Sequence, residues 1–440
     1  MRLAPGEDLL TLPPGPLSPP WVQAKAWIER PVQFWEECAA TFGNTFTIQL
    51  GSVGPTILFS DPHAVQQIFQ LPAESYECRQ FNEHYKYVMG EHSLLLSDGS
   101  AHRRRRRLLL SPLHHNVNRF ANIVESVCQE VIARWPDGKA FMVRPSLHEL
   151  SLRIVLQIVF GGPDDPVAGQ ISDAFTSVIL KGLGTWSPWT RFGRLQAHFR
   201  DLIQIAIADR RRKPNRRETV FDDLIETRDK HGELLGNEEI QDHIFTMLVA
   251  GVDPAAIAIA WGLHWLLACR TIKAKLQQEL SAVDHGGAQR FLALPYLNAV
   301  CHEALRMYPV VATPSGRKLK APAYIMDRAF GAGATLVPCT YLVHHRSDLY
   351  PNASRFQPER FLGRTYSAYE YFPFGGGGRI CIGAALAMLE MKVALGTMLS
   401  TCSLESATEG TVTPVRHGTL LAPSDNLMVS CRSSTLGRVT

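Results

Sequence analysis

The sequence predicts a mainly α-helical fold with a minor β part, organised as one domain over residues 1–440. Two observations predict the class. Long segments carry apolar residues at the three-to-four-residue spacing of amphipathic helices, whereas strand-like alternation is confined to short stretches. A third predicts the single domain, because the chain has no internal repeat and no low-complexity linker. Hydrophobic residues at 45% and charged residues at 20% are typical of a globular protein.

The elements are expected in this order. The Pro-rich segment 1–22 forms an extended lead-in, and 45–60 forms a β-hairpin about the turn SVGP. Asn237 is the expected N-cap of the longest helix, because two glutamates that suit the positive end of a helix dipole follow it. Short strand-like pieces fill 311–345, and helices are expected at 116–135, 147–160, 191–212, 237–270, 297–308 and 382–399.

Charge and cysteine content exclude several classes of function. A formal net charge of +4 over 440 residues gives no reason to expect nucleic-acid binding. The nine cysteines are scattered, odd in number and form no CxxC pair, which argues against a disulfide framework or a zinc ribbon. No secretory signal is expected in the Pro-rich segment. We therefore expect a cytoplasmic protein.

The run 244–268 is the one segment apolar enough to be considered a membrane span. It contains Asp253, Pro254 and His264, and no second span would accompany it. A helix that is apolar on every side is more simply the buried centre of a large helical protein. We therefore expect no membrane span.

Asp253 and Pro254 interrupt this otherwise apolar helical pattern, which reads LVAGVDPAAIAIA. Proline inside a helix removes a hydrogen bond and costs about 3 kcal/mol. A carboxylate on an apolar helix needs water, a partner or a function. The pair therefore marks either a kink without catalytic meaning or a functional site.

Cys381 stands between a glycine-rich run and the start of a helix, in YFPFGGGGRICIGAALAMLEMK. Glycine allows the backbone to approach a bulky ligand closely. The helix dipole and the nearby Arg379 would favour a Cys381 thiolate, and backbone N–H groups could donate to a metal-bound sulfur. A lone cysteine after such a turn is more often simply buried. The spacing of the neighbouring residues is therefore needed to choose between a buried cysteine and a metal ligand.

That spacing resembles the haem-binding signature of the cytochrome P450 family. The matching positions are Phe374, Gly377, Arg379, Cys381 and Gly383. The resemblance implies that haem b is the cofactor and that the thiolate of Cys381 is the axial iron ligand.

Two further motifs are similar to motifs of the same family. HEALRMYP places Glu303 and Arg306 three residues apart on one helical face, and QPERF supplies Arg360. An exposed ion pair of this kind contributes little to stability. The family pattern instead implies a buried triad that holds the segment leading to Cys381.

Five consecutive arginines occur in DGSAHRRRRRLLLSPLH. His102 and Arg106 are one helical turn apart and could grip an anionic group; the resemblance implies that they and Arg317 bind the haem propionates. The other arginines are expected to face outward and to dock an acidic ferredoxin, itself served by a ferredoxin reductase. No aromatic interleaving or reader motif accompanies the run, so it is not expected to bind nucleic acid.

The resemblance covers essentially the whole chain and is greatest to soluble bacterial, notably cyanobacterial, members. It implies the cytochrome P450 fold, with haem between the central long helix and the helix after Cys381. It also implies a monomeric oxidoreductase that uses O2 and donated electrons, in which the cofactor supplies the chemistry and the protein positions the substrate.

One position departs from the family pattern. The small-Gly-x-acid-Thr motif of the central helix reads Ala250, Gly251, Val252, Asp253 and Pro254 here. The two small residues would let haem and oxygen lie against the helix, and the aspartate keeps the family acid. Proline offers no N–H to the carbonyl four residues back, so a groove in the helix would survive, but the threonine hydroxyl is lost.

The lost hydroxyl makes oxidative coupling of phenols or indoles the leading interpretation, since coupling requires no transfer of oxygen to the substrate. Conventional monooxygenase hydroxylation of a terpene or fatty acyl substrate stays open, as does a peroxide-using variant, although no arginine beside Pro254 would anchor a carboxylate. The non-enzyme alternative is a haem-binding sensor or inactive homologue. We expect a small hydrophobic or aromatic natural product of secondary metabolite biosynthesis as substrate.

Matching segments indicate which residues form the substrate pocket, although core or surface packing is the alternative for each of them. They come from the 81–97 loop, the 176–190 region, the central helix and the C-terminal third of the chain. They are Phe81, Tyr85, Leu95, Trp186, Trp189, Val252, Ala255, Val311, Thr313 and Leu420.

Overall fold

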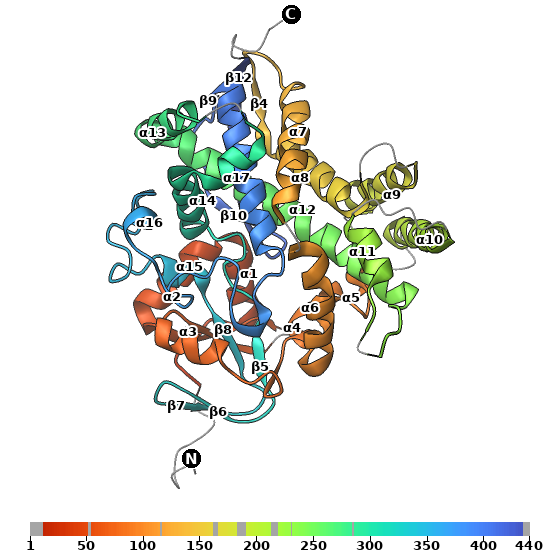
Figure 1. Cartoon of the computed structure of the whole chain (residues 1–440). Coiled ribbons are helices and arrows are strands. Elements are labelled where there is room, and N and C mark those ends of the chain that lie inside the picture. The colour runs from red at the N-terminus through yellow and green to blue at the C-terminus, as the bar shows by residue number, and fades with distance from the viewer. Residues whose placement is uncertain are drawn as a thin grey trace, which may run out of the picture.

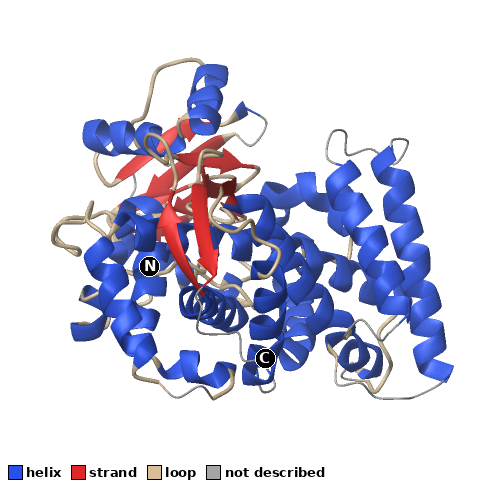
Figure 2. Ribbon diagram, turned by 90° about the horizontal axis from the view of Figure 1, so that it is seen from above, coloured by secondary structure: helices blue, strands red, loops and turns tan. Residues whose placement is uncertain are grey.

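Helices dominate the fold, and the longest of them, α12 (Asn237–Ala268), runs through the middle of the molecule (Figure 1). The strands gather on one side, whereas helices fill the other (Figure 2). The mainly α class with a minor β part is thereby confirmed. The computed structural model describes residues 12–51, 54–114, 117–161, 166–182, 191–212, 219–229, 231–283 and 286–433.

The remaining α-helices fall on either side of α12 in the chain. Those before it are α1 (Pro20–Glu29), α2 (Pro31–Phe42), α3 (Pro62–Phe69), α4 (Arg79–Asn82), α5 (Lys86–Met89), α6 (Gly99–His114), α7 (Ala121–Ile132), α8 (Val143–Phe160), α9 (Pro166–Gly182), α10 (Arg191–Arg212) and α11 (Val220–Glu226). Those after it are α13 (Arg270–Ser281), α14 (Pro295–Met307), α15 (Thr340–His344), α16 (Arg360–Gly363) and α17 (Ala384–Thr401).

The largest sheet has five strands in the order β1-β2-β8-β5-β3. Its β1 and β2 form the antiparallel hairpin that the sequence predicts, and β8 joins β2 in parallel. These strands are β1 (Thr45–Gln49), β2 (Pro55–Phe59), β3 (Tyr76–Glu77), β5 (Arg317–Leu319) and β8 (Thr335–Pro338). The smaller sheets join β4 (Ala140–Met142), β12 (Met428–Ser433) and β9 (Cys402–Ser406), then β6 (Ala323–Ile325) with β7 (Arg328–Phe330), and β10 (Pro414–His417) with β11 (Leu420–Pro423).

Most predicted helix ranges differ from the structure by a few residues at an end, and three other boundaries differ as follows. The extended lead-in ends at Pro19, because α1 starts at Pro20, where a proline suits the first turn. The strand-like segment 311–345 ends in the short helix α15. Asn237 is the first residue of α12 rather than its N-cap, which is Gly236. The Asn237 side chain is engaged elsewhere, since its Oδ1 accepts from Arg211 Nη1 at 2.8 Å.

Burial explains why α12 is apolar on all sides. It packs against α8, α17 and α14, so most of its length lies inside the fold. Within the described residues, α12 and α17 are the two helices long and apolar enough to cross a membrane, but 72% and 56% of their apolar windows are buried. Such burial is typical of core helices.

The helix continues without interruption through Pro254. Proline has no N–H, so the carbonyl of Ala250 lacks the donor that a regular helix would supply. Ala250 is also exposed, whereas Leu248 and Val252 beside it are buried. Other parts of the protein therefore leave Ala250 uncovered on this face of α12.

Candidate active site around Cys381

Cys381 lies in the turn between the glycine-rich run and α17. Its backbone N–H donates to the carbonyl of Phe374 at 2.9 Å, and Gly383 is the N-cap of α17. The side chain is reached by solvent, yet protein surrounds it closely enough for burial to raise the pKa of the thiol. The backbone N–H of Gly383 and the charge of Arg106 oppose this rise. A metal that binds the sulfur would take it as thiolate.

Arg379 does not act on the thiol as the sequence led us to expect. Its guanidinium forms an ion pair with Asp98, directly before α6. The carboxylate of Asp98 also accepts the backbone N–H groups of residues 78 and 79, at 2.8 and 3.1 Å. Asp98 therefore joins α6 to the cysteine loop. Asp98 was not among the predicted site residues, although an aspartate directly before a helix is a typical helix-capping residue.

Arg106 of α6 contacts the cysteine turn from outside it. Its Nη1 donates to the carbonyl of Ile380 at 2.6 Å, and burial lowers its pKa. His102, one turn earlier on α6, is buried, and desolvation together with Arg379 and Arg106 lowers its pKa to about 4. His102 is therefore a neutral imidazole near neutral pH.

The glycine run is needed for contact with the end of α3. A Cβ at Gly376 would lie 2.2 Å from the Phe69 ring, and one at Gly377 would lie 2.3 Å from the Phe69 carbonyl oxygen. Gly377 also has φ +62°, a conformation that side chains disfavour. These two glycines therefore serve packing of the protein on itself, rather than approach of a ligand.

Arg317 is a buried cation with one donor unused. It is 1% exposed, its Nη2 donates to the carbonyl of Gly376 at 3.0 Å, and the rings of Phe69 and Tyr76 lie beside its guanidinium. Its Nε has no hydrogen-bond partner within the described residues. A buried guanidinium requires an anionic or polar partner. The accessible sulfur of Cys381 and these cations together fit haem, which combines an iron with two carboxylates.

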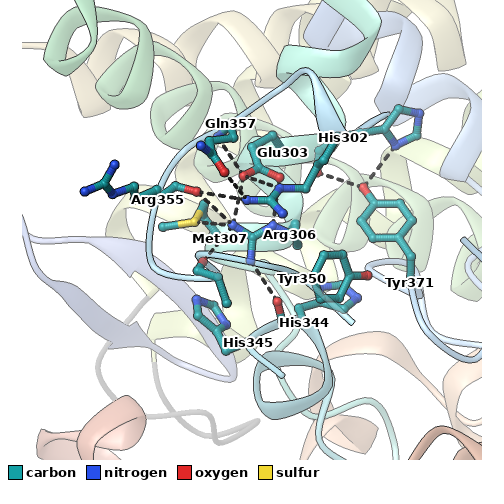
Figure 3. A network of polar contacts seen from close by, with 12 residues as sticks. His302, Glu303, Arg306, Met307, His344, His345, Tyr350, Arg355, Gln357 and Tyr371 are labelled. Atoms are coloured by element: carbon teal, nitrogen blue, oxygen red, sulfur yellow. Dashed lines mark hydrogen bonds and ion pairs between the residues drawn. The ribbon is translucent and has the colours of Figure 1, made fainter. Parts of the chain in front are cut away.

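Glu303, Arg306 and Arg360 form a buried network, of which Figure 3 labels Glu303 and Arg306. Arg306 donates Nε to Glu303 Oε2 at 2.7 Å and Nη2 to Oε1 at 2.8 Å. Arg360 Nε also donates to Glu303 Oε1, at 3.1 Å. The side chains of Glu303 and Arg306 are 0% exposed, so this is not the surface ion pair that three-residue spacing alone would permit.

The network reaches the segment that leads to the cysteine. Arg306 Nη1 donates to the backbone carbonyl of His344 at 2.8 Å, and His344 Nε2 accepts the backbone N–H of Phe372 at 3.0 Å. The hydroxyl of Tyr371 donates to the carbonyl of His302 at 2.9 Å, on the same helix as Arg306 (Figure 3). These bonds anchor residues 371 and 372, two positions before Phe374.

Asp253 turns towards α8 and β10. Its Oδ1 lies 3.1 Å from His148 Nε2, and its Oδ2 lies 3.8 Å from His417 Nε2. Burial would raise the pKa of Asp253, but the hydrogen bond and charge of His148, with His417 and Arg144, lower it overall. Neither histidine carried a signal in the sequence, because each lies on a different element far along the chain.

Gly251 and two predicted pocket residues on α12 belong to the packed core instead. A Cβ at Gly251 would lie 3.2 Å from Val155 of α8, so the glycine permits close helix packing rather than approach of a cofactor. Val252 and Ala255 are 3% and 5% exposed, so both are buried in this structure. Their place in the substrate pocket stays a prediction.

The other predicted pocket residues are partly buried where the structure describes them. The hydroxyl of Tyr85 is 2.7 Å from Thr419 Oγ1, which links the 81–97 loop to the β10–β11 turn. Trp186 and Trp189 lie outside the described residues. The partly buried residues are Phe81, Tyr85, Leu95, Val311, Thr313 and Leu420.

The arginine run on α6 is more fully paired than expected. Arg104 Nη1 lies 2.6 Å from Glu239 Oε1, and Arg105 Nε lies 3.6 Å from the same oxygen. Arg103 forms an ion pair with Glu74. Arg107 is exposed. The outward-facing basic patch is therefore smaller than the five consecutive arginines suggest.

Comparisons with known proteins agree with this geometry. The family model described as Cytochrome P450 matches residues 13–431. Cytochrome P450 135B1 of Mycobacterium tuberculosis is 31% identical over 445 residues, which cover 98% of this chain and 93% of the relative. The retinoic acid-bound cyanobacterial CYP120A1 is 24% identical, with a TM-score of 0.82 and coverage of 97% and 100%. The cytochrome P450DA haem domain is 18% identical, with a TM-score of 0.83 and coverage of 96% and 98%.

Proposed function

The chain belongs to the cytochrome P450 family and is therefore a haem-thiolate protein, and we propose that Cys381 supplies the thiolate of an oxidase or monooxygenase acting on a small hydrophobic or aromatic natural product. The observation that carries the proposal is the accessible Cys381 sulfur, held in the turn before α17 beside Arg106. When bound, the haem supplies oxygen activation and electron transfer.

The haem carboxylates would be held by Arg317, Arg106 and His102. The unused Nε of Arg317 supports this assignment, because a buried guanidinium is stable only with a partner. Arg106 adds a second cation next to the cysteine turn. His102, one turn before Arg106 on α6, would donate a ring N–H to a haem carboxylate.

Asp253 would hold and release the protons that oxygen reduction consumes. Its Oδ2 faces His417, whose side chain is half exposed and therefore in contact with solvent protons. On the neighbouring turn, Ala250 offers a carbonyl that lacks its helical donor and could hold a water. Pro254 offers no hydroxyl, so Asp253 and such a water would carry the protons alone.

This altered site supports oxidative aryl coupling of phenols or indoles as the leading reaction. Coupling removes electrons and hydrogen from its substrates and returns no oxygen to them, so it tolerates a changed oxygen site. Hydroxylation of a terpene or fatty acyl substrate is the second candidate. The retinoic acid held by the cyanobacterial CYP120A1 is an isoprenoid, which favours a terpene for that alternative.

A ferredoxin is the proposed electron donor, with a ferredoxin reductase behind it. Arg107 is exposed, and Arg103 is half exposed, on the helix that carries Arg106. Because Arg103, Arg104 and Arg105 already face carboxylates, their attraction for an acidic donor is reduced. We propose a cytoplasmic monomer that binds no nucleic acid.

The absorption spectrum of the reduced protein under carbon monoxide tests the central assignment. A thiolate-ligated haem gives a red-shifted Soret band, and Cys381→Ala should abolish it. Cys269→Ala is the matched control, since Cys269 is the other described cysteine that is not buried. A red-shifted band that persists in Cys381→Ala would refute the assignment of the ligand.

Turnover separates the enzyme from a haem-binding sensor. A ferredoxin and its reductase, NADPH and a panel of phenols, indoles, terpenes and fatty acids should yield a coupled or hydroxylated product by mass spectrometry. Spectral shifts with ligands but no product from any donor or from peroxide would favour the sensor or an inactive homologue.

A further inference from the structure

A continuous series of aromatic side chains leads from α12 to Trp27 of α1, which is 8% exposed. The ring centroids of Trp261 and Tyr308 are 4.3 Å apart, and those of Tyr308 and Tyr341 are 6.5 Å apart. Trp35 follows at 5.9 Å from Tyr341, and Trp27 at 5.2 Å from Trp35. Every member is a tryptophan or tyrosine, the side chains most easily oxidised by one electron after cysteine.

The series begins on α12, two helical turns after the segment that is predicted to face the haem. Trp261 follows Pro254 by seven residues, which is two helical turns, so both lie on the same face. The indole N–H of Trp261 donates to the carbonyl of Leu421 at 2.9 Å. The backbone N–H of Tyr341 donates to the carbonyl of Ala312 at 3.4 Å, between two predicted pocket residues. The aromatic series therefore runs behind the predicted pocket wall.

Tyr341 is the member with a proton acceptor. Its ring is 4% exposed, and its hydroxyl donates to Glu36 Oε1 at 2.7 Å. Glu36 itself is exposed, so a proton on its carboxylate can exchange with water. A phenol that loses an electron becomes a strong acid, and a carboxylate already bonded to its hydroxyl can take the proton without any rearrangement.

Trp27, at the outer end, is a poorer site for a positive charge. The guanidinium of Arg416 lies over its ring at 5.4 Å from the centroid. A cation radical at Trp27 would be repelled by that charge. The neutral radical left by Tyr341 after proton loss would not be, so an oxidising equivalent in the series should come to rest at Tyr341.

Tyr350 is a useful comparison, because its hydroxyl bonds to a peptide carbonyl whereas that of Tyr341 bonds to a carboxylate. It is also buried among aromatic rings, stacked on Tyr366 at 4.6 Å. Its hydroxyl, however, donates to the backbone carbonyl of Glu370 at 2.9 Å. A peptide carbonyl cannot take up a proton at neutral pH. Aromatic packing alone therefore does not distinguish Tyr341, whereas its carboxylate partner does.

We propose that Tyr341 is a redox-active tyrosine. It is oxidised by one electron when no substrate consumes the oxidising equivalents. This role rests on the proposed haem site: once peroxide has oxidised a bound haem, Tyr341 would supply one electron through Tyr308 and Trp261. The phenolic proton moves to Glu36, which leaves a neutral tyrosyl radical. A thiol or ascorbate in solution then returns one electron to Tyr341, and the proton returns from Glu36.

Electron paramagnetic resonance on freeze-quenched protein tests this role directly. The ferric holoprotein, with its haem content set by the Soret band, is mixed with hydrogen peroxide in the absence of substrate. Wild type should give a tyrosyl signal near g = 2, and Tyr341→Phe should lower it about tenfold. Glu36→Gln should lower it by a similar factor, because the amide cannot accept the proton. Tyr350→Phe is the matched control and should keep the signal.

A nitroso spin trap and peptide mass spectrometry identify the residue independently. The adduct should appear on the peptide that contains Tyr341 in wild type and be absent in Tyr341→Phe. In both Tyr341→Phe and Glu36→Gln, haem absorbance should bleach with fewer equivalents of peroxide. The exposed position of Glu36 keeps its variant folded should Tyr341→Phe fail to load haem. A radical signal absent from wild type, or unchanged in both variants, would overturn the proposal.

Discussion

Asp253 on α12 pairs with His148 on α8, with Oδ1 3.1 Å from Nε2. The carboxylate that the sequence predicts at the oxygen site is thus tied to a neighbouring helix, and His417 on β10 lies 3.8 Å from its second oxygen. The pair is therefore a structural link between α12 and α8.

The same pair predicts how stability depends on pH. Because the folded protein lowers the pKa of Asp253 below its ordinary 3.8, its stabilisation is present above that pH and is lost as the pH falls through the lower, folded value. The side chain is 38% exposed, so Asp253→Asn should cost only about 0.5–1 kcal/mol at pH 7. Urea unfolding of the variant and wild type at pH 7 and pH 3 measures the difference in their free energy of unfolding.

At pH 3 the variant and wild type should approach each other in stability. Asp327→Asn, at an exposed turn position, is the control and should change little at either pH. A loss in Asp253→Asn that is equally large at both pH values would mean that the charge of Asp253 is not what stabilises the fold.

The buried pair Glu303–Arg306 predicts a much larger effect. Removing one partner leaves an uncompensated buried charge, so Arg306→Ala should cost about 3–5 kcal/mol. Arg306→Lys should be only partly better, because one ammonium cannot reach Glu303 and the carbonyls of His344 and Ala353 together. The free energy of unfolding and the yield of haem-loaded protein are the measurements.

Lys25→Ala provides the surface control for this variant. Lys25 and Glu29 form an i,i+4 pair with both side chains more than 60% exposed, so the loss should stay within about 0.5 kcal/mol. If Arg306→Ala unfolded with no larger loss than Lys25→Ala, the network in Figure 3 would have no special part in holding the cysteine loop.

Local motifs made part of this site predictable from the sequence. Cys381 and Gly383 keep fixed spacing along one short segment, and Glu303 and Arg306 share one helical face. The side chains that complete the site come from elsewhere in the chain. His148 and His417 reach Asp253 from α8 and β10, and nothing in either local segment indicates that contact.

For two residues that the sequence singles out, the structure shows a different neighbour from the one expected. Arg379 was expected to act on the thiol, but Asp98 is close enough to pair with it. Gly251 was expected to admit a cofactor, but Val155 occupies that side. A residue type and its spacing indicate that a position is constrained, whereas the neighbour that constrains it depends on how distant elements pack.

The glycine run allows this explanation to be tested at two adjacent positions, Gly377 and Gly378. Gly377→Ala places a Cβ 2.3 Å from the Phe69 carbonyl and forces φ +62° on alanine, so we expect a loss of about 2–4 kcal/mol. Gly378→Ala meets nothing closer than 4.0 Å and should be tolerated. Thermal unfolding and haem content compare the two. Equal losses would show that flexibility of the run, rather than contact with α3, explains its composition.

Pro254 decides whether the unusual oxygen site has chemical consequences. Pro254→Thr restores both a backbone N–H for the carbonyl of Ala250 and the hydroxyl of the family motif, whereas Pro254→Ala restores only the N–H. If proton delivery limits the wild type, Pro254→Thr should change the share of donated electrons that appears in product, by about 10²-fold at most. Hydrogen peroxide released per NADPH consumed is the direct measurement.

The comparison between the two variants isolates the hydroxyl. A change in Pro254→Thr that Pro254→Ala does not share assigns the effect to proton delivery, and a shift from coupled to hydroxylated product would support coupling as the native reaction. A change common to both variants would assign the effect to the helix backbone, because both variants regain the same backbone hydrogen bond. If product, rate and peroxide release stay at wild-type values in both variants, Pro254 is an accommodated helix proline without catalytic meaning.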